Sequence, residues 1–257
     1  MIKTISLLYL LIITMFASSQ KTMMLDSVLK TNSEALSVKM RGGGMMKYDF
    51  GIYKTISAKA GWTKGKSKSK LFSGKEEVES KQNSSIEIVA NEKDTATINV
   101  ALNIKEESVR EKVISFSKDR VAWEREEEPS KYKQSRNLVA DISTSIDTNT
   151  WNFVYIDEYD IEKPQSKMKA NGVVSDGTRN IEIKSVRKWD NGKSPTLYSK
   201  VGFELFIDGV AVAAVQNPMD TFQKKFVWLK NDLDEYTKMI LAAAAVLLLS
   251  YGVLMPD

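Results

Sequence analysis

The sequence predicts a mainly β protein, a closed antiparallel β-barrel around a hydrophobic C-terminal α-helix. Runs rich in β-branched and aromatic residues recur between residues 48 and 229, separated by Gly, Asn and Asp turn residues. An uncharged apolar stretch, Met239 to Met255, follows the last of these runs. A meander of strands has to close or cover its edges, and a helix that is apolar on all sides has to be enclosed by apolar groups. A closed sheet around the helix meets both requirements.

The first predicted strand is Tyr48 to Ile56. It follows the glycine run Gly42-Gly43-Gly44, which we expect to be a flexible hinge or a bulge. A hairpin comes next, with strands at Ser85 to Ala90 and Thr95 to Ile104 joined by a polar loop. The segment between Lys105 and Ser135 is dense in charges of both signs, and we expect it to be mostly loop and edge strand.

The second half of the chain contains the clearest hairpin, because Val201 to Ile207 alternates with a period of two and Asp208-Gly209 is a type I′ turn signature. Val210 to Val215 is its returning strand. The remaining predicted strands are Val113 to Phe116, Asn137 to Ile142, Trp151 to Ile156, two runs on either side of Asp176-Gly177, and Thr221 to Leu229. The meander therefore has roughly ten or more strands.

The terminal helix is predicted over about residues 231–254, with Asn231 as its cap and Asp232, Asp234 and Glu235 in its first turn. Its apolar part spans about 26 Å, slightly less than a bilayer core, so length alone does not distinguish a buried helix from a membrane span. No Lys or Arg follows the apolar stretch, contrary to the positive-inside rule for an exported protein. We therefore prefer the buried helix and keep a C-terminal membrane anchor as the alternative.

Residues 1–19 have the features of a signal peptide: Lys3, an apolar run from Ile5 to Phe16, and small residues before Gln20. They predict export, to a bacterial periplasm or cell envelope or into the medium. Residues 20–34 are expected to form a lead segment, with a short helix near Met23 to Lys30, and residues 35–257 a single barrel domain.

The absence of two residue types excludes several kinds of chemistry. The chain has no Cys, which excludes disulfides and thiol catalysis, and no His, the commonest general base and zinc ligand. We expect no metal, no cofactor and no enzymatic activity. The net charge of +4 is too small to indicate nucleic acid as a partner.

The strand-rich chain that ends in "FELFIDGVAVAAV" and "VWLKNDLDEYTKMILAAAAVLLL" resembles the tubby-like C-terminal superfamily, which includes the LURP-one-related and phospholipid-scramblase-like proteins. The resemblance is mainly architectural and covers Leu36 to Leu254, with residue-level likeness only over Val201 to Leu249. It implies a closed barrel of about twelve strands threaded by the C-terminal helix. Members of this kind often associate with membranes through anionic lipid headgroups, but none of their headgroup-binding residues can be matched to a position here.

The most basic stretch is "KAGWTKGKSKSKLFSGK", in which Lys64, Lys66, Lys68 and Lys70 recur at every second residue after Trp62. In an extended chain the four lysines share one face. They indicate either a contact for an anionic lipid or glycolipid surface or an edge strand protected by lysines.

The most acidic stretch is "YIDEYDIEK", in which Glu158, Asp160 and Glu162 would share one face of a strand and Asp157 the other. Paired carboxylates could hold Ca²⁺ or act in a hydrolase, but the spacing lacks the pattern of a calcium loop. We interpret the stretch as a solvated face, with a carboxylate-dependent hydrolase as a remote alternative. The sequence thus predicts an exported binding or scaffold barrel with anionic lipid or a membrane surface as its partner.

Overall fold

The computed structural model of the chain describes residues 21–41, 47–69, 75–109, 112–117, 120–125, 130–163, 168, 170–195, 200–218 and 223–251. The predicted signal peptide, the glycine run Gly42-Gly43-Gly44 and Lys70 lie outside the described residues. The signal peptide and the export that it implies therefore stay predictions.

Strands make up most of the described chain, and the helices within it are α2 (Ser27–Thr31) and α3 (Glu235–Ser250). The strands are β1 (Ser33–Ser37), β2 (Lys39–Met40), β3 (Tyr48–Phe50), β4 (Tyr53–Ala60), β5 (Lys64–Ser69), β6 (Lys75–Ala90), β7 (Asp94–Val109), β8 (Lys112–Ser117), β9 (Arg120–Arg125), β10 (Lys131–Thr144), β11 (Trp151–Asp160), β12 (Ala170–Ser175), β13 (Asn180–Val186), β14 (Gly202–Ile207), β15 (Val210–Gln216) and β16 (Phe226–Lys230).

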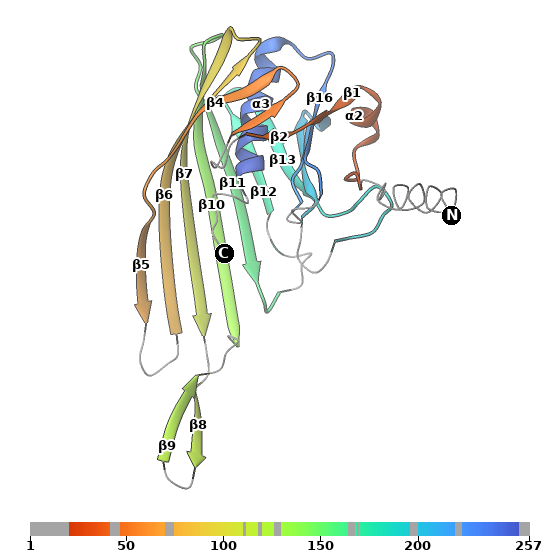
Figure 1. Cartoon of the computed structure of the whole chain (residues 1–257). Helices are drawn as coiled ribbons and strands as arrows, with labels where there is room; N and C mark the ends of the chain where they lie inside the picture. The colour runs from red at the N-terminus through yellow and green to blue at the C-terminus, as the bar shows by residue number, and fades with distance from the viewer. Residues whose placement is uncertain are drawn as a thin grey trace, which may run out of the picture.

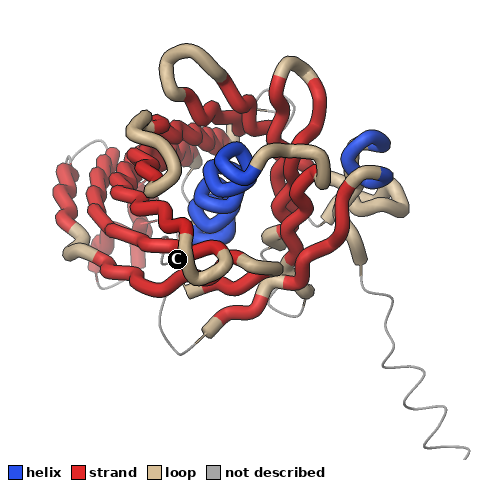
Figure 2. The backbone as a smooth tube through the Cα atoms, turned by 90° about the horizontal axis from the view of Figure 1, so that it is seen from above, coloured by secondary structure: helices blue, strands red, loops and turns tan. Residues whose placement is uncertain are grey.

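One antiparallel sheet wraps around α3 (Figures 1 and 2). Its strands follow the order β1-β16-β15-β14-β13-β12-β11-β10-β7-β6-β4-β3-β2, and this path of 13 strands is nearly closed into a barrel. β5 pairs only with β6, beside the path. The predicted fold class, an antiparallel barrel around a C-terminal helix, is confirmed.

The two ends of the sheet are linked by a single short stretch of chain. β1 pairs with β16 and β2 pairs with β3, and between them the amide of Val38 donates a hydrogen bond of 3.0 Å to the carbonyl of Lys225. The chain therefore changes its partner strand just after Val38. We call residues 33–40, which form this junction, the seam.

Helix α3 fills the inside of the barrel. Every residue from Met239 to Ser250 is buried, and Ala242 to Ala245 are fully inaccessible. The small alanines allow the surrounding strands to approach the helix closely on all sides, where larger side chains would overpack. No helix within the described residues is long and apolar enough to cross a membrane. The preferred interpretation, a helix buried within the barrel, is confirmed.

The start of α3 differs from the prediction. Its cap is Asp234 rather than Asn231, and Asp234 Oδ1 accepts a hydrogen bond of 2.8 Å from the amide of Thr237. Asn231 instead lies in the turn after β16, where its amide donates to the carbonyl of Asn32 at 2.9 Å. Asn and Asp are equally good caps, so the sequence alone does not distinguish them.

Turn residues explain why one predicted hairpin is observed and why one predicted strand is divided into two. Asp208 and Gly209 both have positive φ, at 50° and 77°, as the predicted type I′ turn between β14 and β15 requires. The predicted strand Tyr48 to Ile56 is instead two strands, β3 and β4, because Gly51 with φ 53° turns the chain back on itself.

The long strands continue well past the barrel (Figure 1). We call this part the sheet extension: β5 with residues 75–83 of β6, 103–109 of β7, 131–137 of β10 and 156–160 of β11. β8 and β9 form a separate two-stranded sheet beyond it. Residues 105–135 were expected to be mostly loop and edge strand. The predicted strand Val113 to Phe116 lies within β8, but the described part of this segment contains more strand than expected, because the dense charges there lie largely on the paired strands β7, β8, β9 and β10.

The lead segment packs against the outside of the barrel. Met23 and Leu29 are buried in a second apolar cluster with Trp189, Val201 and Trp228. The amide of Met23 donates a hydrogen bond of 2.8 Å to Oε1 of the buried Gln216. These residues are therefore an integral part of the folded body.

Candidate functional site

The predicted lysine face lies on β5, at the outer edge of the sheet extension. Lys64, Lys66 and Lys68 are exposed and alternate along the strand, so they share one face as predicted. Trp62, just before β5, is 92% exposed. The fourth predicted member, Lys70, lies outside the described residues.

Carboxylates on the next strand lie opposite two of these lysines. Lys66 pairs in register with Glu79 and Lys68 with Glu77, whereas Lys64 is opposite Lys81. The pKa of Glu79 is lowered, first by a hydrogen bond and charge from Lys81 and then by the charges of Lys105 and Lys66. The lysine face is therefore part of a surface that carries charges of both signs, and the sequence of β5 alone could not show this.

Lysines still outnumber carboxylates on this outer face of the sheet extension. The alternation and registers of the five strands place there Lys64, Lys66, Lys68, Lys75, Lys81, Lys105, Lys131 and Lys133, together with Glu77, Glu79, Glu107, Glu158 and Asp160. The outer face consequently keeps a positive balance.

The acidic stretch around residue 160 is divided between two faces. Asp157 points to the inner face of the sheet and Glu158 and Asp160 to the outer face, where Asp160 forms ion pairs with Lys133 and Lys163 at 3.6 and 3.5 Å. Glu162 lies beyond the end of β11, so it does not share a strand face with the other two as expected. Within the described part of the chain no group of Asp and Glu side chains could hold a metal ion.

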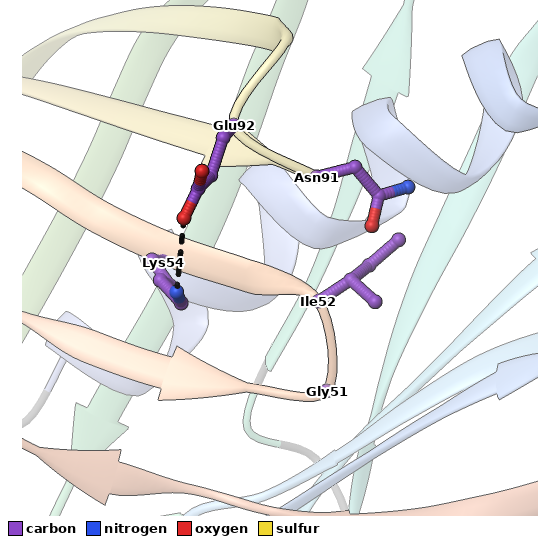
Figure 3. Close-up of a pocket in the computed structure, with 5 residues that line it drawn as sticks. All are labelled: Gly51, Ile52, Lys54, Asn91 and Glu92. Carbon is purple, nitrogen blue, oxygen red and sulfur yellow. Dashed lines mark ion pairs between the residues drawn. The ribbon is translucent and has the colours of Figure 1, made fainter.

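A shallow, open depression lies at the opposite end of the molecule, between the β3–β4 and β6–β7 turns (Figure 3). It is lined by Gly51, Ile52, Lys54, Asn91 and Glu92. Lys54 and Glu92 form an ion pair of 4.0 Å across it, and their side chains are 49% and 88% exposed. An exposed pair of this kind contributes little and leaves no unmatched charge to attract a ligand.

A further cluster, which could not be predicted from the sequence, lies at the lower mouth of the barrel, where α3 ends and the sheet extension begins. The ammonium of Lys200, just before β14, donates hydrogen bonds to Asp157 Oδ2 and, at 3.0 Å, to the hydroxyl of Tyr155. The hydroxyl of Tyr251, at the end of α3, donates to the same carboxylate oxygen. Because β12 and β13 separate β11 from β14 in the sheet, these contacts cross the inside of the mouth.

Aromatic rings surround the Lys200 ammonium. Its nitrogen lies 5.1 Å from the ring centre of Tyr155, 5.9 Å from that of Phe203 and 5.0 Å from that of Tyr251. Burial lowers the pKa of Lys200, although the charge and hydrogen bond of Asp157 oppose the shift, and Arg187 and Arg136 lower it further. Burial likewise raises the pKa values of Tyr155 and Tyr251, with the charge of Asp157 as the next cause.

Searches against protein families, curated proteins and solved structures found no match to this chain. The fold and the surfaces described above are therefore the basis for any statement about function.

Proposed function

We propose that this protein is an exported, non-enzymatic binding or scaffold barrel whose sheet extension contacts an anionic lipid or glycolipid surface. The observation that supports this proposal best is the position of Trp62, which is 92% exposed beside the exposed Lys64, Lys66 and Lys68 on a strand that extends past the barrel. The resemblance to tubby-like proteins agrees with such a role and stays a prediction.

The chemistry of these side chains suits a charged interface. A Trp ring has an apolar body and a polar N–H, and it partitions to the boundary between headgroups and acyl chains. Each lysine near an anionic membrane surface contributes about 1 kcal/mol. Since α3 occupies the inside of the barrel, the outer surface is where a large partner can bind.

Co-sedimentation with vesicles tests the lipid contact. We expect the chain without residues 1–19 to bind phosphatidylglycerol-containing vesicles and not phosphatidylcholine vesicles. Replacing Lys64, Lys66 and Lys68 by Glu should weaken this binding at least about tenfold, since each lysine contributes about 1 kcal/mol. Trp62→Ala should also weaken vesicle binding relative to the wild type. This loss should be clearest at high salt, where the charge contribution of the lysines is screened.

A matched control changes the same number of charges elsewhere. Lys30, Lys39 and Lys93 are exposed on other parts of the described surface, so their replacement by Glu should leave most of the vesicle binding intact. Equal losses in the two triple variants would reduce the effect to net charge and would contradict a contact on β5.

Cell fractionation and intact mass measurement test the export separately. We expect the full-length chain to be recovered from the envelope or medium as a product that begins at Gln20. A cytoplasmic product that retains residues 1–19 would contradict export, whatever the outcome of the vesicle assay.

A further inference from the structure

Two arginines near the lower mouth of the barrel have no partner among the described residues. Neither Arg136 nor Arg187 forms an ion pair or a side-chain hydrogen bond with any residue that the structure describes, and Nε of Arg136 is buried without a partner. Both side chains are only partly exposed. The other arginines with described side chains, Arg41 and Arg179, are paired with Asp49 and Asp176 at 2.6 and 2.7 Å.

The strand registers bring these two arginines to the same mouth of the barrel. Arg136 on β10 is directly opposite Asp157 on β11 and faces inward with it. Arg187 follows the end of β13, whose Val186 pairs with Gly202 and accepts a hydrogen bond of 2.8 Å from the amide of Val201. Arg187 is therefore beside Lys200, across the mouth from Arg136.

Among the residues that the structure describes, the charges at the mouth do not balance. Three cations, Arg136, Arg187 and Lys200, share one carboxylate, Asp157, whose Oδ2 already accepts from Lys200 and Tyr251. The next carboxylate along the inner face, Glu106, accepts a hydrogen bond from Gln134 and forms no ion pair with Arg136 in the described chain. Cations held together in a partly buried site repel each other unless an anion joins them.

We propose that the lower mouth of the barrel binds an oxyanion, the carboxylate or phosphate of a ligand, between Arg136 and Arg187, with Lys200 and Asp157 as its floor. Guanidinium groups are suited to this role because their N–H donors match two oxygens of one carboxylate or phosphate. The site is separate from the lysine face of β5, and it does not depend on the lipid contact proposed above.

A purely structural role explains only part of this cluster. Lys200, Asp157 and Tyr251 connect β14, β11 and α3, and that would suffice to close the barrel. Arg136 and Arg187 add no bond to this closure and increase the repulsion on Lys200. Their uncharged replacement should therefore leave the fold intact and remove the binding site, and this difference can be measured.

Titration of the labelled protein with inorganic phosphate, at constant ionic strength, tests the proposal directly. We expect amide resonance shifts centred on residues 136, 157, 187 and 200, and a rise in melting temperature with phosphate concentration. Arg136→Gln and Arg187→Gln should each weaken phosphate binding by about 10- to 100-fold, as expected for loss of a charge-assisted hydrogen bond. Lys105→Gln, on the outer face of the same sheet, should leave it unchanged.

The source of the oxyanion is distinguished by a second probe, soluble dihexanoyl phosphatidic acid. Tighter binding than that of inorganic phosphate, at the same residues, assigns the site to a lipid headgroup, and binding no tighter assigns it to a free anion. If neither probe shifts these resonances, or if both glutamine variants fold and bind phosphate as the wild type does, the proposal is wrong. Because the readout is at the mouth, vesicle binding through β5 is not required for either result.

Discussion

The indole nitrogen of Trp151 donates a hydrogen bond of 2.7 Å to the hydroxyl of Tyr236, joining the first residue of β11 to the first turn of α3. The guanidinium of Arg179 lies over both rings, 4.8 Å from the centre of Trp151 and 5.4 Å from that of Tyr236. At the other end of the helix, Tyr251 is bonded to Asp157 of the same strand. β11 thus holds both ends of the central helix.

Trp151→Phe should destabilise the protein by about 1–3 kcal/mol, because the buried ring keeps its place while the hydrogen bond and part of the cation–π contact are lost. Urea unfolding followed by circular dichroism measures this change. Trp62→Phe is the matched control, since Trp62 is 92% exposed and should change the stability by less than about 0.5 kcal/mol. An equal loss in the two variants would contradict the role of the Trp151–Tyr236 bond.

Removing both members of the Lys200–Asp157 pair should cost less than the sum of the two single removals. The two side chains are only 14% and 19% exposed, so Lys200→Met leaves a largely buried carboxylate and should cost about 2–4 kcal/mol. Lys200→Met/Asp157→Leu should be less destabilised than the sum of the single changes, with a coupling of about 1 kcal/mol or more.

The exposed pair Lys184 and Glu182, separated by 3.0 Å, is the control for this cycle. Its coupling should lie near the 0–1 kcal/mol typical of surface pairs. If the Lys200–Asp157 cycle gives a value in that lower range, the mouth is more hydrated than its burial implies.

The protein should lose stability at alkaline pH. Burial, assisted by the charge of Glu235, raises the pKa of Tyr53 to about 12, and burial also raises the pKa values of Tyr48, Tyr155 and Tyr251. In the unfolded chain a tyrosine ionises near 10, so the folded state holds more protons above this pH. The contribution is therefore fully present below pH 10 and is lost as the pH rises toward 12.

Urea unfolding at pH 7 and at pH 11 checks this prediction, and Tyr53→Phe isolates one residue. Between pH 10 and pH 12, the raised pKa of Tyr53 corresponds to about 2–3 kcal/mol of the free energy of unfolding. The variant should therefore lose less stability than the wild type between the two pH values. An identical decline in the two proteins would show that Tyr53 ionises normally in the fold.

Enlarging an alanine of α3 should overpack the barrel. Ala244→Leu inserts a branched side chain where the native residue is fully inaccessible, and it should cost about 1–3 kcal/mol or more. Ala60→Leu, at the exposed end of β4, is the control and should have little effect. Thermal unfolding of the two variants gives the comparison, and an unchanged melting temperature for Ala244→Leu would mean that the barrel has free space around the helix.

The sequence predicted the parts of the fold that depend on local pattern. The uncharged stretch around Ala242 to Ala245 requires enclosure by apolar groups, and Asp208-Gly209 requires positive φ, so both features could be read from residue type alone. The length of β6 and β7 could not, because their outer halves alternate between charged and polar residues without an apolar face. Pairing with neighbouring strands, rather than burial, is what keeps those halves extended.

The lysine face of β5 and the cluster at the lower mouth also differ in how far they could be predicted from the sequence. The lysine face of β5 lies within seven residues of sequence, so alternation was enough to predict Lys64, Lys66 and Lys68 on one face. The cluster at the lower mouth combines β10, β11, the end of β13, the start of β14 and the end of α3. No local spacing connects Arg136, Arg187 and Lys200, and only the curvature of the sheet brings them together.

The barrel can be completed only after the last part of the chain has been made. Residues 33–40 connect β16 to β3, and α3 follows every strand of the barrel along the chain. During synthesis, the early strands therefore emerge before the helix that fills the inside of the barrel and before β16, with which β1 pairs. The apolar inner faces of the strands therefore stay uncovered until the carboxyl-terminal part of the chain arrives.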